Sequence, residues 1–209
     1  MRFVLLFLAV ISSATASVVP AYAAGPGPSA FQRIYGSANP PYGFVRFCSS
    51  FPQDCAAVDV ADKRVEATPV RFAELDAVNR SVNKAIEPVT DLEQYGVEEL
   101  WTLPTTGKGD CEEYVLVKRR LLMQMDWPTS SLLITVVLDE NKQGHAVLTA
   151  RTSGGDLVLD NKHDQIKIWS ATPYTFLVRQ SFMNPMAWVS LDAKDTGSPA
   201  AIAGVRTRN

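Results

Sequence analysis

Three side chains of this sequence could together perform nucleophilic chemistry: Cys111, His145 and Asp160. The thiolate is the reactive form of cysteine, a histidine can accept the thiol proton, and a carboxylate can orient the imidazole. Cys111 stands in the segment GDCEEYVLVKRRLL, directly after Asp110. Asp110 is a good N-cap, and Glu113 three residues later completes a capping-box pattern. The segment therefore predicts a helix whose first turn carries the cysteine.

Two opposite effects act on a thiol at this position. The unsatisfied N–H groups of a helix N-terminus form a positive end that favours the thiolate. The neighbouring acidic residues disfavour it, because nearby negative charge raises the pKa of a thiol. On this segment alone, a reactive Cys111 and a small buried residue beside ordinary capping residues are equally good interpretations. A nearby base is needed to decide between them.

The chain contains only two histidines, His145 and His163. His145 begins an alternating strand, and Asp160 ends the next one. A two-residue hairpin on Gly154-Gly155 would put both on one face but four residues out of register, so direct opposition requires a longer or bulged connection. His163 lies among polar residues past a strand end and is expected to face solvent. Two histidines and one free cysteine match no usual zinc pattern.

The elements that must position these residues change from helical to strand-like along the chain. Residues 24–50 are rich in proline and predict an extended lead-in segment. Thr68 and Pro69 start a predicted helix that ends by Pro88, and Asn79 and Asn83 on its flank are expected to face solvent or bond to a neighbouring loop. Strands are predicted at 132–138, 145–151, 156–161, 174–182 and 187–191. The order indicates an α+β fold in which the cysteine helix packs on an antiparallel sheet.

The first residues predict export. Arg2 precedes an apolar run at 3–11, and AYA, ending at Ala23, matches a small-x-small cleavage site. We expect residues 1–23 to be a signal peptide cleaved near Ala23, with a retained N-terminal anchor as the alternative. The run is too short to span a bilayer, which takes about 20 residues. No cysteine follows it, which argues against a lipid anchor.

Export places the cysteines in an oxidising compartment. Cys48 and Cys55 flank a proline-containing turn in FCSSFPQDC, and we expect them to form a disulfide rather than to be two separate small hydrophobic residues. This pairing leaves Cys111 as the odd thiol. The formal charge of −2 and the pI near 5.7 give no indication of a nucleic-acid or anionic-membrane partner. Residues 24–192 are expected to form one domain, and 193–209 a flexible tail.

The motifs GDCEEYVLVKRRLL, GHAVLTART, GDLVLDN and RQS, in this order, resemble the bacterial transglutaminase-like cysteine proteinase family. The resemblance covers about residues 40–191, and includes VNRSVN and YGVEELW. It implies a transglutaminase-like or papain-like core with the triad Cys111, His145 and Asp160. Some members are periplasmic calcium-dependent proteases that cleave surface adhesins. The resemblance therefore implies a periplasmic or secreted bacterial protein with a protein substrate, and a regulatory protein is a further candidate partner.

The resemblance also maps a calcium site onto Asp110 and Glu112. Two carboxylates are far short of the roughly six to eight oxygen ligands that calcium takes, so helix capping is the alternative. CEEY carries Glu113 where the family commonly has an aspartate, which leaves the metal preference open. The chemistry itself requires no cofactor.

The leading functional hypothesis is an exported cysteine endopeptidase. His145 would take the thiol proton, Asp160 would hold the imidazole, and the Cys111 backbone N–H would contribute to an oxyanion hole. Trp101 could donate a second hydrogen bond there, although an ordinary core aromatic residue is the better interpretation. Acyl transfer to an amine by the same triad, as in a transglutaminase, is one alternative. A binding module without catalysis is the other.

Overall fold

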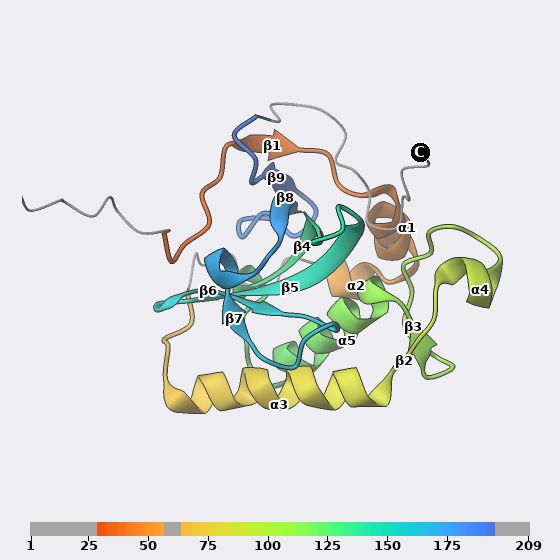
Figure 1. Ribbon diagram of the computed structural model, residues 1–209, viewed down its shortest axis with the longest axis horizontal. Coiled ribbons are helices and arrows are strands. Elements are labelled where there is room, and N and C mark those ends of the chain that lie inside the picture. The colour runs from red at the N-terminus through yellow and green to blue at the C-terminus, as the bar shows by residue number, and fades with distance from the viewer. Residues whose placement is uncertain (1–28, 57–63, 195–209) are drawn as a thin grey trace, which may run out of the picture.

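A seven-stranded antiparallel sheet forms the centre of the computed structural model, which describes residues 29–56 and 64–194 (Figure 1). The strands lie in the order β1-β9-β8-β4-β5-β6-β7. They are β1 (Gly36–Ala38), β4 (Leu132–Leu138), β5 (Gly144–Thr152), β6 (Gly155–Leu159), β7 (Lys167–Ile168), β8 (Thr175–Gln180) and β9 (Trp188–Ser190). The expected signal peptide, and the expected tail from residue 195 onwards, lie outside the described residues.

Helices cover one face of this sheet. The helix α5 (Cys111–Gln124) packs on β4 and β5, and α3 (Pro69–Ala85) packs on α5 from the outside (Figure 1). The other elements are α1 (Tyr42–Ser50), α2 (Pro52–Cys55), α4 (Asp91–Tyr95), 3-10 turns at Thr129–Ser131 and Trp169–Ala171, and a parallel pair of β2 (Glu87–Pro88) with β3 (Lys108–Gly109). The α+β fold with the cysteine helix on an antiparallel sheet is confirmed.

No helix within residues 29–56 and 64–194 is both long and apolar enough to cross a membrane.

The central strands are buried on both faces. Residues of β4 and β5 that face the helices join a large core with α1, α3 and α5, whereas alternate residues join a smaller cluster on the opposite face. The large core includes Ile134, Val136, Ala146 and Leu148. The smaller cluster consists of Val137, Val147, Val158, Tyr174 and Phe176. His145 and Asp160 belong by alternation to the face of the smaller cluster.

The expectation of an extended lead-in at 24–50 is wrong for its last nine residues, which form α1. Pro41 is the N-cap residue, so the prolines end where the helix begins. Phe44 and Phe47 lie three residues apart and are 1% and 2% exposed, and Phe44 contacts the rings of two tryptophans edge-on. A disulfide joins Cys48 on α1 to Cys55 on α2. This segment is therefore part of the core.

The helix α3 begins as predicted. The Thr68 side chain accepts a hydrogen bond from the Arg71 N–H at 3.2 Å, and Pro69 occupies the first helical position. The buried residues on the apolar side of α3 include Leu75, whereas Phe72 is 48% exposed.

The β5–β6 hairpin turns one residue earlier than the predicted Gly154-Gly155 turn. Thr152 pairs with Gly155, so Ser153 and Gly154 form the turn, and the last pair is Leu148 with Leu159. Continued past this pair, the register would set Asp160 opposite Val147, two residues from His145. Such diagonal neighbours on one face are within reach of long side chains. The longer or bulged connection considered above is therefore unnecessary.

Candidate active site

Cys111 is the first residue of α5, and the chain around it explains why the helix starts there. The Glu113 side chain turns back to accept hydrogen bonds from the Asp110 N–H at 2.9 Å and the Thr102 N–H at 3.1 Å. A Cβ atom at Gly109 would lie 2.7 Å from the Glu113 Cβ, so only glycine fits before the helix. The GDCEE motif therefore fixes the backbone that presents the thiol.

The partly buried thiol lies between the acidic helix tip and the edge of β5. The Cys111 Sγ donates a hydrogen bond to Glu112 Oε2 at 3.0 Å and accepts one from the Ala146 N–H at 3.4 Å. The pairing of β6 with β5 stops before Ala146, so the sulfur takes the place of a strand partner there. The thiol is thus held beside the residue that directly follows His145.

His145 and Asp160 form a buried pair. The His145 Nε2 lies 2.9 Å from Asp160 Oδ1, and the two side chains are 2% and 4% exposed. The same Oδ1 accepts the Lys162 N–H at 3.0 Å, and the Tyr174 hydroxyl donates to Oδ2. The Tyr174 ring also meets the imidazole edge-on at 5.7 Å between centroids. Tyr174 was not predicted, because a tyrosine at the start of a strand carries no signal of this contact.

The partners of Asp160 keep it ionised. Burial by itself raises the pKa of this carboxyl, but the hydrogen bond and the charge of His145, with the bonds from Tyr174 and Lys162, lower the pKa to about 2. An ionised Asp160 requires the proton on His145 Nε2, so Nδ1 is the ring nitrogen left to accept a proton. This half of the site is arranged as a base with its orienting group.

At the acidic tip of α5, in contrast, the surroundings disfavour the ionised form of the thiol. Burial of the thiol, followed by the charges of Glu112 and Asp110, raises the pKa of Cys111 well above its usual value. Burial, which the sequence did not show, is the largest cause, and the acidic neighbours considered from the sequence add to it. In this arrangement the protonated thiol is the favoured form.

Five carboxyl groups gather at this tip, those of Asp91, Glu99, Asp110, Glu112 and Glu113. Burial, together with the charge of Asp110, raises the pKa of Asp91 to about 6 and that of Glu113 to about 9. Burial also raises the pKa of Glu99 to about 7, with the charges of Asp110 and Asp91 adding to it. Neither Asp110 Oδ1 nor Glu112 Oε1 has a hydrogen-bond partner among the described residues, although both are buried.

Two further residues singled out in the sequence lie as the milder interpretations predicted. Trp101 is 3% exposed and packs edge-on against Phe44, and its indole N–H donates to Glu99 Oε1 at 2.6 Å. It is a core aromatic residue whose donor is already used. His163 is exposed in the turn after β6. Neither residue takes part in the arrangement around Cys111.

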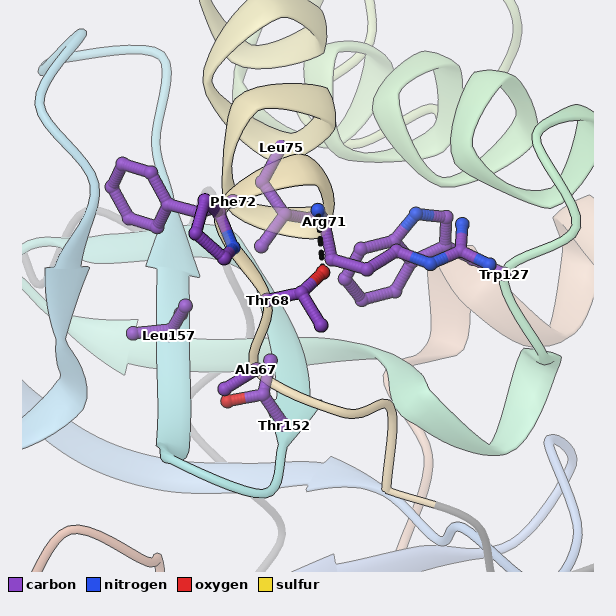
Figure 2. A pocket seen from close by; sticks show the side chains of 9 residues that line it. Ala67, Thr68, Arg71, Phe72, Leu75, Trp127, Thr152 and Leu157 are labelled. Carbon is purple, nitrogen blue, oxygen red and sulfur yellow. Dashed lines mark hydrogen bonds between the residues drawn. The ribbon is translucent and has the colours of Figure 1, made fainter.

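A separate cavity lies at the far end of α5 and β5 from the thiol. Its volume is about 380 Å³. Figure 2 shows the first turn of α3 on one side, the Trp127 indole on another and Thr152 and Leu157 from the sheet below. The Arg71 guanidinium carbon lies over the Trp127 ring, 5.5 Å from its centroid. Because Thr152 is the last residue of β5 and His145 the second, this cavity is not part of the arrangement around Cys111.

Comparison with known proteins identifies the family. The family described as bacterial transglutaminase-like cysteine proteinase (BTLCP) matches residues 34–196. A structure of calcium-bound Legionella pneumophila LapG is similar, with a TM-score of 0.50 and 24% identity over 66% of this chain and 77% of that chain. A second structure of Legionella pneumophila LapG gives a TM-score of 0.46 and 27% identity over 55% and 65%. No curated protein matches the chain in sequence. The family match spans most of the chain, which therefore belongs to the bacterial transglutaminase-like cysteine proteinases, a family of cysteine peptidases.

Proposed function

We propose that this chain is an exported cysteine endopeptidase that cleaves a periplasmic or cell-surface protein with Cys111, His145 and Asp160. The observation that carries the proposal is the buried pair of His145 with Asp160, in which His145 lies on the strand whose Ala146 N–H binds the Cys111 sulfur. Export is supported by the N-terminal sequence pattern, and by the Cys48–Cys55 disulfide, which is typical of oxidising compartments.

The proposed reaction begins with a proton transfer from the Cys111 Sγ to His145 Nδ1. A sulfur electron pair then forms a bond to the scissile carbonyl carbon, and the π electron pair of the C=O bond moves onto the carbonyl oxygen. When the tetrahedral intermediate collapses, the C–N bond breaks and the imidazolium gives its proton to the leaving amine. A water molecule, deprotonated by His145, hydrolyses the resulting thioester and restores the thiol. Asp160 stays ionised throughout and holds the Nε2 proton.

The start of α5 is suited to stabilise the negative oxygen of that intermediate. Cys111 is the first helical residue, so its N–H has no partner within the helix. A backbone donor of this kind costs no reorganisation during the reaction. The Trp101 indole is not proposed as the second donor, because Glu99 already accepts its hydrogen bond.

We also propose that the helix tip binds calcium through Asp110 and Glu112. Each has a buried carboxylate oxygen without a partner in the described ranges, and buried oxygens of this kind suit a hard cation. Asp91 and Glu113 place further oxygens within 4.8 Å of Asp110. A structural relative, LapG, is described as calcium-bound. Bound calcium would supply positive charge next to the thiol, whose pKa is raised by burial and by the charges of Glu112 and Asp110.

The proposed peptidase activity can be tested without knowing the substrate. Active protein and the Cys111→Ala variant would be incubated in parallel with envelope proteins, and new N-termini would be mapped by mass spectrometry. The alanine variant should keep the fold, since alanine is a good helix residue and Asp110 still precedes it. Cleavages that require Cys111 are expected. Identical sets of N-termini from both proteins would refute the proposal.

The calcium proposal has a separate test that does not depend on activity. We expect the melting temperature in calcium chloride to exceed that in chelator, since a ligand at 100 times its Kd adds about 2.7 kcal/mol of stability. Glu112→Gln should remove most of this difference. Melting curves that coincide in calcium and chelator for the unsubstituted chain would leave Asp110 as a helix cap only.

A further inference from the structure

The VNRSVN motif of α3 has no part in the mechanism described so far. It places Asn79 and Asn83 one turn apart on the side of α3 that faces the turn following β6. Asn79 is fully buried and Asn83 half-buried. Both were expected from the sequence to face solvent or bond to a neighbouring loop, and the second of these options is the one observed.

Both asparagines donate hydrogen bonds to residues 160–164. The Asn79 Nδ2 donates to the backbone carbonyls of His163 at 3.1 Å and Asp164 at 2.9 Å. The Asn83 Nδ2 donates to the backbone carbonyl of Asp160 and to Asp164 Oδ1, each at 2.9 Å. The helix α3 is therefore hydrogen-bonded to both ends of the turn at residues 160–164. One of these bonds is to the backbone carbonyl of Asp160.

Asp160 needs such support because the sheet no longer holds it. The last β5–β6 pair ends at Leu159, so Asp160 is the first residue outside the ladder. Its carboxylate is bound on one side by His145 and Tyr174, while its carbonyl is bound on the other by Asn83. A long helix is a rigid support, and small displacements of an orienting group reduce catalytic rates strongly.

The two side-chain amides use their Nδ2 donors but not their Oδ1 acceptors, which indicates that the donors explain why asparagine stands at both positions. Asn79 Oδ1 and Asn83 Oδ1 are buried, and neither has a hydrogen-bond partner in the part of the chain that the structure describes. An unpartnered buried acceptor is unfavourable, and an apolar residue at either position would avoid that cost. The amides are thus better explained by what they hold than by helix packing.

We propose that Asn79 and Asn83 are positioning residues that set the place of Asp160 against His145. The inference rests on the proposed triad and adds α3 to the parts of the fold on which the reaction depends. Neither asparagine touches the substrate in this proposal. Their effect on the thiol passes entirely through Asp160, and this makes the proposal testable against a purely structural role.

The test measures how fast iodoacetamide alkylates Cys111, in a buffer containing calcium chloride, between about pH 5 and pH 9, a range that includes the usual histidine and cysteine pKa values. Asn79→Ala, Asn83→Ala and Asn83→Asp would each be made in the unsubstituted chain and in Asp160→Ala. Asn83→Asp keeps the shape of the side chain but puts an acceptor where the donor was. Lys84→Ala, an exposed neighbour on α3, is the matched control. Melting temperatures would show which variants fold.

With Asp160 present, we expect each asparagine variant to slow alkylation near neutral pH by roughly tenfold or more, since misplaced catalytic groups can cost up to about a hundredfold. The pH profile should shift in the same direction as that of Asp160→Ala. In the Asp160→Ala background the same substitutions should lower the alkylation rate by less than about twofold, because there is no longer a carboxylate to position. Lys84→Ala should match the unsubstituted chain in both backgrounds.

The inference would be overturned if the asparagine substitutions lowered the alkylation rate equally in the unsubstituted chain and in Asp160→Ala, or if they lowered it in neither. If Asn83→Ala does not fold, the same comparison with Asn83→Asp and Asn79→Ala decides it. Failure of the proposed triad is recognised separately: His145→Ala and Asp160→Ala alone would then leave alkylation of Cys111 unchanged. That result would overturn both proposals before any asparagine variant is considered.

Discussion

Tyr174→Phe should destabilise the protein through the loss of one oxygen atom. The Tyr174 hydroxyl donates to Asp160 Oδ2, and the remaining ring can still meet the His145 imidazole edge-on. The substitution therefore removes a hydrogen bond to a buried ionised carboxylate without creating a large cavity. Hydrogen bonds to charged groups contribute about 1.5–3 kcal/mol.

The pKa of Asp160 gives a scale for this magnitude. It is lowered from 3.8 to about 2, which corresponds to about 2.5 kcal/mol at about 1.36 kcal/mol per pKa unit. Since Tyr174 is only one of the groups that lower it, we expect a loss of about 1.5–2.5 kcal/mol at neutral pH. A lowered pKa in the folded state contributes stability above the unfolded pKa, and this stability is lost as the pH falls through the folded pKa. The loss should thus be constant above about pH 4 and shrink towards pH 2.

Urea unfolding followed by tryptophan fluorescence at neutral pH and near pH 3 would measure this loss. Tyr35→Phe, at an exposed tyrosine, is the control and should unfold like the unsubstituted chain. A Tyr174→Phe variant that unfolds at the same urea concentration as the unsubstituted chain would refute the bond to Asp160. A loss that is equally large near pH 3 would refute the role assigned to the ionised carboxylate.

Three further predictions concern the helix tip and the N-terminal part of the domain. Asp110→Asn, assayed in chelator at neutral pH, should speed alkylation of Cys111, because the charge of Asp110 adds to the effect of burial in raising the thiol pKa, and each unit by which that pKa falls raises the thiolate fraction about tenfold; an unchanged rate would contradict the role given to Asp110. Phe47→Ala should lower the free energy of unfolding by about 3–5 kcal/mol, as expected for a buried aromatic residue, and a loss below about 1 kcal/mol would mean that α1 is not part of the core. Replacing Cys48 and Cys55 together by serine should cost about 2–3 kcal/mol; the double variant and the unsubstituted chain should then unfold alike in reductant but not without it.

The sequence predicted the local elements around the site well, because they depend on neighbouring residues. The capping pair Thr68-Pro69 located the start of α3, and alternation located β4 to β6 within one or two residues. The segment that became α1 was misread since its prolines lie directly before the helix rather than in it. Tertiary contacts, such as those of Phe44 with Trp101 and Trp188, make this segment part of the core.

Contacts between distant segments were beyond the sequence. Periodicity placed His145 and Asp160 on the same face of the sheet. Their offset along the strands depends on whether the two-residue turn is Ser153-Gly154 or Gly154-Gly155, which the sequence did not decide. The Tyr174 bond links two strands that are not neighbours in the sheet. The balance of charges on Cys111 likewise depended on how deeply the helix tip is buried, which no residue pattern states.

The two halves of the proposed triad differ in how well their charges are satisfied. His145 and Asp160 are buried together with every oxygen of the carboxylate bound, so their geometry is fixed whether or not the thiol reacts. The thiol half carries buried carboxyl oxygens that have no partner within residues 29–56 and 64–194, and burial together with the nearby negative charge holds the proton on sulfur. Any change that neutralises this tip therefore acts on the nucleophile while leaving the base in place. The reactivity of Cys111 is therefore expected to depend on the charge at the helix tip as well as on the placement of His145 and Asp160.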